Sequence, residues 1–569
     1  MKKGIGASQG YGIGHVVVIK EANLTFQTVT VSDVEAEKKR FQAALDVFME
    51  KTQAMADDIK SRLGEKEAEI LEGHILMMQD PEMTGQIEGT IESEGINAEA
   101  ALSTVCDMFA QMFASIPDEM FQQRATDVKD IKTRMLMILL GQEATDISAV
   151  PAGTVLVAKD LTPSMTAGIN PANVVGILTE VGGKTSHSAI LARALEIPAV
   201  LSIENIVSTV TDGQRVIVDG TAGMVYLNPS NDTVEAYIKK RVAYLNDKKA
   251  LEKFRGLPSQ MASGEQVELV GNIGTPQEAE KVAECDGEGV GLFRTEFLFM
   301  DATSIPTEEE QFQAYKMAAE TLAGKPIIIR TLDIGGDKAI PYLGLETEEN
   351  PFLGYRAVRF CLDRKGDIYK PQLRALLRAS AFGKIRIMVP LVTCVEEIRE
   401  VKAMVAELKA DLDEKGIAYD KDIKVGIMTE TTASAVLADV LAKEADFFSI
   451  GTNDLTGYTM AVDRGNAKVA YLYSSYQPAV LRSIHRIIEC GKKEGIMVGM
   501  CGEAAADPML VPVFLAWGLD EFSVSPTSIL ATRKVMSQWT MEEAKEVADK
   551  VLTFATEAEV VEYLKSVAK

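Results

Sequence analysis

The sequence predicts a multidomain α/β protein, in which an α/β domain with an inserted helical domain is followed by a C-terminal (β/α)8 barrel. Three observations support this prediction. The chain has 569 residues, which is too long for one core and typical of about three to four domains. A stretch with helical periodicity separates two strand-rich stretches. In the last part, about 310 residues long, eight apolar strand candidates alternate with mostly helical segments. An open doubly wound sheet is the alternative there.

The α/β domain is expected in two pieces, residues 1–25 and 145–230. The first twenty residues are typical of a glycine-rich turn followed by a strand. Apolar runs return later as GTVLVAKD, NVVGILTE, PAVLS and RVIVDG. We expect the N-terminal strand to join these later strands, which makes the segment between the two pieces an insertion.

The insertion, residues 26–144, is predicted to be helical. SDVE at Ser32 is a capping-box pattern. Helical breaks are expected near Pro81, Gly95 and Pro117. Apolar residues recur at the spacing of one helix face, at Phe41, Leu45, Phe48, Met55, Ile59 and Leu63.

A charged helical linker, residues 231–258, is expected to lead into the barrel, residues 259–569. No GxGxxG motif opens a helix after the first strand of this last part, so dinucleotide binding is disfavoured.

Composition excludes several classes of protein. The net charge of −24 disfavours nonspecific binding to nucleic acid or anionic membrane. No apolar run approaches the roughly 20 residues of a membrane helix, and no signal segment is evident. The six cysteines are far apart without a CxxC pair, which suits a cytoplasmic protein.

Charge is concentrated in one stretch of the helical insertion. The stretch from Glu65 to Glu119 contains thirteen acidic residues and only one lysine, Lys66. Such a stretch is either a solvated helix surface or a docking face for a basic protein, since complementary charge speeds encounter.

Charged and reactive residues follow several predicted barrel strands, where the carboxyl ends of the strands meet and catalysis occurs in such barrels. An isolated charge at a strand end is usually part of a surface ion pair, but several such ends together predict one pocket. These residues are Arg294, Arg330, Asp333, Lys338, Glu430, Asn453, Asp454, Arg464, Cys501 and Glu503.

Several arginines in one pocket indicate a small anionic substrate, because guanidinium groups match carboxylate and phosphate oxygens in pairs. Glu430 and Asp454 would repel such a substrate unless a hard cation, most simply Mg²⁺, lay between them. The alternative is a general acid/base pair, which leaves the arginines unexplained.

His187 lies in GGKTSHSAILAR, residues 182–193. A lone histidine is usually structural, but here two glycines allow a ligand to approach and a helix begins, which favours phosphate. A neutral imidazole can attack phosphorus at physiological pH. His187 is in a different predicted domain from the arginine pocket, so a phosphoryl group would have to travel by domain movement.

These segments together resemble the phosphoenolpyruvate–protein phosphotransferase (enzyme I) family of the bacterial sugar phosphotransferase system. The resemblance covers essentially the whole chain, including EGHILMMQDPE, LTPSMTAGI, GLFRTEFLFMD, RTLDIGGDK, NPFLGYRAVR, DFFSIGTNDLTGYTMAVDRGN and GMCGEAAADP. It implies a phosphohistidine α/β domain, a helical domain that binds the phosphocarrier protein HPr, and a barrel that binds phosphoenolpyruvate and forms a homodimer.

The resemblance also implies roles for individual residues. His187 is the phosphorylated residue, Thr166 orients its ring, and Cys501 protonates the enolate to give pyruvate. Glu430 and Asp454 bind Mg²⁺. His74, Asp80 and Glu82 fall in the part that resembles the HPr-binding surface. The substrate-binding set is Arg294, Arg330, Asn453, Asp454, Arg464, Lys338 and Arg356.

Three positions depart from the family pattern: Gly457, Thr432 and Tyr476 stand where glutamine, proline and histidine are usual. None is a transfer or metal residue. Two alternatives therefore stay open beside the phosphotransferase: a paralogous enzyme that serves a dedicated carrier, and a regulatory binding protein that has lost turnover.

Overall fold

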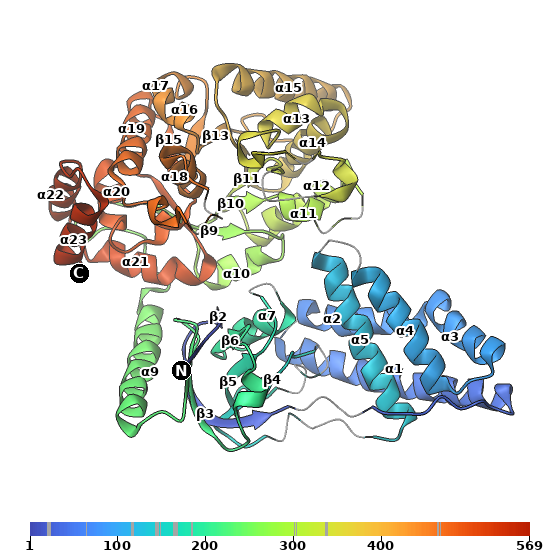
Figure 1. Cartoon of the computed structure of the whole chain (residues 1–569). Coiled ribbons are helices and arrows are strands. Elements are labelled where there is room, and N and C mark those ends of the chain that lie inside the picture. Colours follow the sequence, from blue (N-terminus) through green and yellow to red (C-terminus); the bar gives the residue numbers. More distant parts are fainter. Residues whose placement is uncertain are drawn as a thin grey trace. The chain divides into compact units, whose positions relative to one another are not determined.

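The computed structural model divides into two compact units, residues 1–248 and 249–569 (Figure 1). It describes residues 1–19, 24–63, 65–114, 119–142, 147, 150–162, 165, 169–183, 186–300, 302, 304–335, 340–346, 348–463, 466 and 468–569. Among these residues, no helix is both long enough and apolar enough to span a membrane.

The first unit contains an eight-stranded mixed sheet with the order β1-β8-β7-β3-β4-β5-β6-β2. The strands are β1 (Lys2–Lys3), β2 (Ile5–Ser8), β3 (Tyr11–Val18), β4 (Thr154–Ala158), β5 (Val174–Thr179), β6 (Ala199–Leu201), β7 (Arg215–Asp219) and β8 (Met224–Leu227). β3 pairs in parallel with β4, with His15 opposite Thr154. The helical segment is thus inserted between two neighbouring strands, as the sequence predicts.

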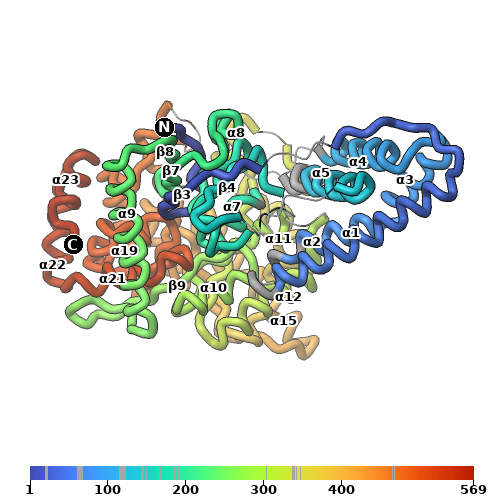
Figure 2. Tube along the Cα trace, turned by 90° about the horizontal axis from the view of Figure 1, so that it is seen from below, coloured from blue at the N-terminus to red at the C-terminus, as the bar shows by residue number. Residues whose placement is uncertain are grey.

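The described part of the insertion contains the helices α1 (Val34–Leu63), α2 (Glu65–Gln79), α3 (Pro81–Glu94), α4 (Ala98–Ala114) and α5 (Glu119–Leu139). α1 packs on α2, and α4 packs on α5, which run side by side in Figure 2. Phe41, Phe48 and Leu102 are buried in their common core. α3 begins at Pro81, capped by Asp80, and ends at Gly95 in the left-handed conformation, so the predicted breaks at these two positions are confirmed. The break expected near Pro117 lies outside the described residues.

The remaining helices of the first unit are short, except α9 (Asn231–Leu251), which leads to the second unit. α7 (His187–Ala194) packs against β2, and α8 (Ile206–Thr209) packs against β4 and β5.

The second unit is a closed barrel of eight parallel strands, so the open sheet is excluded. The strands are β9 (Glu268–Ile273), β10 (Val290–Arg294), β11 (Pro326–Arg330), β12 (Lys384–Val389), β13 (Val425–Thr429), β14 (Phe447–Ile450), β15 (Met497–Met500) and β16 (Glu521–Val524). β16 closes the ring on β9, with Glu521 opposite Glu268.

Helices surround this barrel between successive strands (Figure 1). They are α10 (Glu278–Glu284), α11 (Glu296–Met300), α12 (Glu308–Thr321), α13 (Val358–Asp363), α14 (Lys370–Ala379), α15 (Val395–Glu414), α16 (Thr432–Val436), α17 (Ala438–Leu441), α18 (Thr452–Met460), α19 (Pro478–Glu494), α20 (Val511–Trp517) and α21 (Ile529–Ser537), followed by α22 (Met541–Val551) and α23 (Glu557–Val567).

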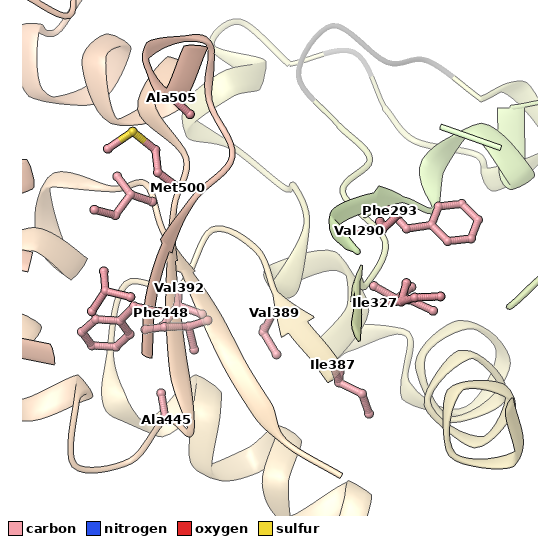
Figure 3. Close-up of a cluster of buried hydrophobic side chains, with 14 of the residues drawn as sticks. Val290, Phe293, Ile327, Ile387, Val389, Val392, Ala445, Phe448, Met500 and Ala505 are labelled. Atoms are coloured by element: carbon pink, nitrogen blue, oxygen red, sulfur yellow. The ribbon is translucent and has the colours of Figure 1, made fainter. Parts of the chain in front are cut away.

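Alternation along each strand sorts its side chains between two cores. Ile327, Ile387 and Phe448 belong to the large core between strands and helices (Figure 3). Their neighbours in sequence, such as Ile328 and Met388, belong to a separate cluster that also contains Cys501. The second set faces the inside of the barrel. Residues two positions further along the same strands, such as Arg330 after Ile328 and Glu430 after Met428, therefore face the mouth of the barrel.

Candidate active site

A cavity of about 700 Å³ lies at the carboxyl ends of the barrel strands. It brings together every residue of the predicted pocket that the structure describes: Arg294, Arg330, Arg356, Glu430, Asn453, Asp454 and Cys501. Asp333 and Glu503, also noted at strand ends, line it as well. Lys338 and Arg464 lie outside the described residues.

The strands themselves place these side chains. Arg294 and Arg330 are the last residues of β10 and β11 and are paired across the sheet. Glu430 directly follows β13, and Cys501 directly follows β15. Parallel strands end on the same rim of a barrel, which is why residues far apart in sequence meet here.

Buried carboxylates anchor two of the arginines. Arg330 Nη2 donates to Glu296 Oε1 at 2.6 Å, and its Nη1 lies 3.0 Å from Asp333 Oδ2. Arg356 donates through Nε to Asp333 Oδ1 at 3.0 Å and through Nη2 to Asp454 Oδ2 at 2.8 Å. These contacts fix the guanidinium planes toward the cavity. Sequence reasoning missed Glu296, although it lies two residues beyond Arg294 at the same strand end.

The two anchored arginines keep their charge. Burial alone would lower the pKa of Arg330, but attraction to Glu296, Asp333 and Glu430 outweighs burial and raises it. The pKa of Arg356 is raised by Asp333 and Asp454 in the same way, against the effect of burial. Within the described part of the chain, the buried Nε atoms of Arg294 and Arg330 have no hydrogen-bond acceptor, so the cavity offers donors to an anion.

The carboxyl group of Glu430 is buried in the cavity, where a negative charge is unfavourable. Burial, then repulsion by Asp454 and Asp333, raises the pKa of its carboxyl to about 8, against the attraction of Arg330 and Arg356. Its Oε1 accepts a hydrogen bond from the Leu391 backbone N–H at 2.7 Å. A Cβ on Gly451 would lie 2.7 Å from Oε2, so the glycine leaves the space that this carboxyl occupies.

A divalent cation fits this arrangement. Glu430 and Asp454 offer hard oxygen ligands and repel each other in its absence. The described residues contain no group of three or more His, Cys, Asp or Glu side chains ready to hold a metal. Two carboxylates completed by phosphate oxygens and water match the way Mg²⁺ is usually held.

Cys501 lines the cavity with only 7% of its surface exposed. Burial raises the pKa of its thiol to about 12; Ser449 and Arg330 oppose this increase, and Glu430 and Glu521 add to it. The thiol therefore carries its proton at physiological pH, as a proton donor must.

His187 is the first residue of α7, and Ser186 is the N-cap. The Ser186 Oγ donates to the Gly183 carbonyl at 2.9 Å and accepts from the Ala189 N–H at 3.4 Å. Gly182 has φ of 109°, a conformation that favours glycine. The His187 side chain and Thr166 are outside what the structure describes, so their predicted roles stay predictions.

His74 departs from the expected surface position. It is fully buried in the helical insertion, with Nε2 3.4 Å from Asp127 Oδ1 and Nδ1 3.8 Å from Asp130 Oδ2. This burial does not fit a direct contact with HPr. Asp80 and Glu82 are exposed, and the Asp80 carboxylate caps α3 by accepting from the Glu82 N–H at 2.9 Å.

The three residues that depart from the family pattern lie at different places in the barrel unit. Gly457 lines a neighbouring pocket of about 370 Å³ that shares Asn453 and Asp454 with the cavity. Thr432 is the first residue of α16. The Tyr476 hydroxyl donates to Asp507 at 2.5 Å.

Three family models match the chain: the N-terminal part of PEP-utilising enzymes at residues 3–124, their mobile domain at 150–223 and their PEP-binding domain at 248–541. Phosphoenolpyruvate-protein phosphotransferases are similar over the whole length. The protein of Priestia megaterium is 46% identical over 99% of this chain and 98% of its own. That of Bacillus subtilis (strain 168) is 46% identical over 100% and 99%.

A solved solution structure of an enzyme I protein is 38% identical over 43% of this chain and 99% of its own, with a TM-score of 0.39. The full-length relatives and the matched models decide the classification: the chain belongs to the phosphoenolpyruvate-protein phosphotransferase family of PEP-utilising enzymes.

Proposed function

We propose that this phosphotransferase transfers the phosphoryl group of phosphoenolpyruvate to His187, releases pyruvate, and passes the group to HPr in the bacterial sugar phosphotransferase system. The observation that carries the proposal is the barrel cavity, which joins three arginines, the proposed metal ligands Glu430 and Asp454, and a protonated thiol. Phosphoenolpyruvate has two anionic groups for the arginines and the cation to bind, and its enolate needs a proton donor such as the thiol.

The arginines bind and orient the substrate. Phosphoenolpyruvate carries a phosphate and a carboxylate, and both match guanidinium forks. The unsatisfied Nε atoms of Arg294 and Arg330 favour binding of such an anion. Fixed positive charge also stabilises the enolate that leaves when the phosphoryl group departs, because buried ion pairs hold Arg330 and Arg356 in place beforehand. Lys338, Arg464 and Asn453 complete the proposed set.

Mg²⁺ is the proposed cation at Glu430 and Asp454. When bound, it would neutralise charge on the transferring phosphoryl group. Glu430→Gln is expected to raise the Mg²⁺ concentration needed for half-maximal activity by about 100-fold or more. Glu503→Gln is the matched control, because Glu503 is exposed at the edge of the same cavity. Titrating activity and Mn²⁺ binding in both variants checks this; equal metal affinity in the two would contradict the assignment.

His187 is the proposed phosphoryl acceptor, and Thr166 the residue that orients its ring. A neutral imidazole can attack phosphorus, and the P–N bond keeps a high transfer potential. Because His187 belongs to the first unit and the cavity to the second, the two must meet during each cycle.

HPr is the proposed acceptor, docking on the acidic helical insertion. Leu76, Asp80 and Glu82 are all exposed and lie within seven residues of one another in the sequence. An apolar side chain and two acidic side chains are therefore close together along this part of the surface. Complementary charge would speed encounter with a basic carrier.

Reversing one charge tests this docking surface. Glu82→Lys is expected to slow transfer to HPr about threefold or more at low salt, with the effect shrinking at high salt because ions screen exposed charges. Glu546→Lys, an exposed reversal on α22, is the control. Rapid-mixing transfer assays measure both. If phosphorylation of His187 slows instead, the acidic surface has another purpose.

A homodimer through the barrels is proposed as well, from the family resemblance. Leu353, Val436 and Tyr471 are large apolar side chains that are more than half exposed on this unit and are available for such a contact.

Pyruvate release tests the function as a whole. The purified protein should release pyruvate from phosphoenolpyruvate continuously when Mg²⁺ and HPr are present, and only once per subunit without HPr. No release with any carrier would favour the regulatory binding protein. Faster turnover with a different carrier would favour the paralogous enzyme.

A further inference from the structure

A buried carboxyl group without partners lies inside the barrel below Cys501. Glu521, the first residue of β16, is 1% exposed, and neither of its oxygens has a hydrogen-bond partner within the described chain. A Cβ on Gly291 of β10 or on Gly499 of β15 would lie 2.7 Å from Glu521 Oε1. The two strand glycines therefore leave the space that the carboxyl group fills.

Polar groups extend from Glu521 toward Cys501. The Ser523 Oγ lies 2.6 Å from the same Cβ position on Gly291, which makes it a neighbour of the Glu521 carboxyl. It donates to Asn272 Oδ1 at 2.6 Å, and Asn272 Nδ2 donates to the Cys501 carbonyl at 3.3 Å. In its ionised form Glu521 would raise the pKa of the Cys501 thiol further, so the two groups interact electrostatically.

The other side of Glu521 leads to a second cavity. This cavity, of about 690 Å³, lies at the amino ends of β9, β15 and β16, opposite the substrate cavity. Glu268, which is paired with Glu521 across the sheet, lines it. Its buried Oε2 has no hydrogen-bond partner among the described residues. Glu268 thus lines the second cavity and lies beside Glu521 on the neighbouring strand.

We infer that Glu521 resupplies the proton that Cys501 gives to the substrate carbon, with the proton drawn past Glu268 from the second cavity. The inference deepens the proposed function and rests on Cys501 as the acid. When the S–H bond breaks and the new C–H bond forms, a thiolate remains. A proton then leaves the Glu521 carboxyl and restores the S–H bond through a water molecule, because the hydrogen bonds of Ser523 and Asn272 lead to the Cys501 backbone carbonyl and not to its thiol. Water protonates the resulting Glu521 carboxylate, so only protons move.

The electrostatics support this role. Burial, then repulsion by Glu268, raises the pKa of Glu521 to about 8; Arg386 opposes the shift and Asp520 adds to it. Glu521 therefore holds a proton at neutral pH in a place where a carboxylate would be costly. An unsatisfied buried carboxyl lowers stability without packing benefit over an apolar side chain, which favours a functional reason for its presence.

Pre-steady-state kinetics of Glu521→Gln test the inference in the full-length protein with phosphoenolpyruvate, Mg²⁺ and excess HPr. The first pyruvate per subunit should form at the wild-type rate, because the resting thiol is already protonated. Later turnovers should slow by about tenfold or more, because the thiolate is no longer resupplied. Glu288→Gln is the control: Glu288 lines the second cavity but accepts a hydrogen bond from the Leu269 N–H, which an amide oxygen can also accept.

Two further measurements keep the inference falsifiable if Glu521→Gln fails to fold. Glu268→Gln should also slow the later turnovers, as Glu521→Gln does. In the wild type, later turnovers should slow as pH rises through about 8 while the first does not, because Glu521 loses its proton there. Wild-type steady-state rates in Glu268→Gln and Glu521→Gln would overturn the inference, as would loss of the first turnover. If Cys501→Ala still forms pyruvate, the proposed acid itself is wrong, which is a separate outcome.

Discussion

Cys501→Ala is expected to lower pyruvate formation by about 100- to 10,000-fold, the usual contribution of a positioned acid. Labelling of His187 from phosphoenolpyruvate should fall with it, because the transfer is driven by protonation of the enolate to pyruvate. Labelling of His187 in the reverse direction, from phosphorylated HPr, should be unchanged, since that step needs no carbon protonation. Quenched-flow assays in both directions measure the two rates.

Cys285→Ala is the matched control for this variant, because Cys285 is half-buried at the end of α10 and does not line the cavity. The thiol of Cys501 keeps its proton because burial raises its pKa to about 12. A Cys501→Ala protein that forms pyruvate at the wild-type rate would show that solvent, and not the thiol, protonates the carbon.

Arg330→Met and Arg294→Met are expected to lose activity to a similar extent, by about 1,000-fold, but to differ in stability. Removing the Arg330 guanidinium leaves Glu296 buried without its cation, while Asp333 keeps Arg356; breaking a buried pair in this way costs about 3–5 kcal/mol. No ion pair of Arg294 is recorded within the described chain; its guanidinium lies 4.9 Å from the ring centre of Phe297. Its loss should leave stability nearly unchanged.

Steady-state kinetics and denaturant unfolding of both variants separate these effects. The predicted result is two inactive proteins of which only Arg330→Met unfolds earlier. Equal destabilisation would mean that the carboxylates around Arg330 gain a proton or find other partners. Full activity in Arg294→Met would remove Arg294 from the substrate-binding set.

Much of the site could be predicted because its position depends on local sequence. In a parallel barrel, a residue that ends a strand lies at the mouth, so Arg294, Arg330, Glu430 and Cys501 could be grouped from the strand pattern alone. The barrel itself follows from eight apolar runs separated by helical segments. The insertion was visible because its helical periodicity interrupts strands that pair with each other.

Contacts between distant elements could not be predicted in this way. The pairing of Glu296 with Arg330 depends on how two neighbouring strand ends face each other, and the pairing of Arg356 with Asp454 joins residues that are 98 positions apart. No pattern in the sequence indicates that Glu521 is buried, and only the glycines facing it in the structure show why it is.

The burial of His74, by contrast, did have a signal in the sequence. Leu71, His74 and Met78 are spaced by three and four residues, as on the buried face of a helix, and all three are buried. The assignment of His74 to the HPr-binding surface rests on the family resemblance, which does not say which face of the helix the residue occupies. Helical spacing was the better guide.

The central claim is that the barrel cavity supplies a phosphoryl group to His187. Incubating the full-length protein with phosphate-labelled phosphoenolpyruvate and Mg²⁺, then mapping the label, tests it most directly. The claim predicts one acid-labile, base-stable label per subunit on His187 and none in His187→Ala. Label that persists in His187→Ala, or none in the wild type while pyruvate still forms, would contradict it.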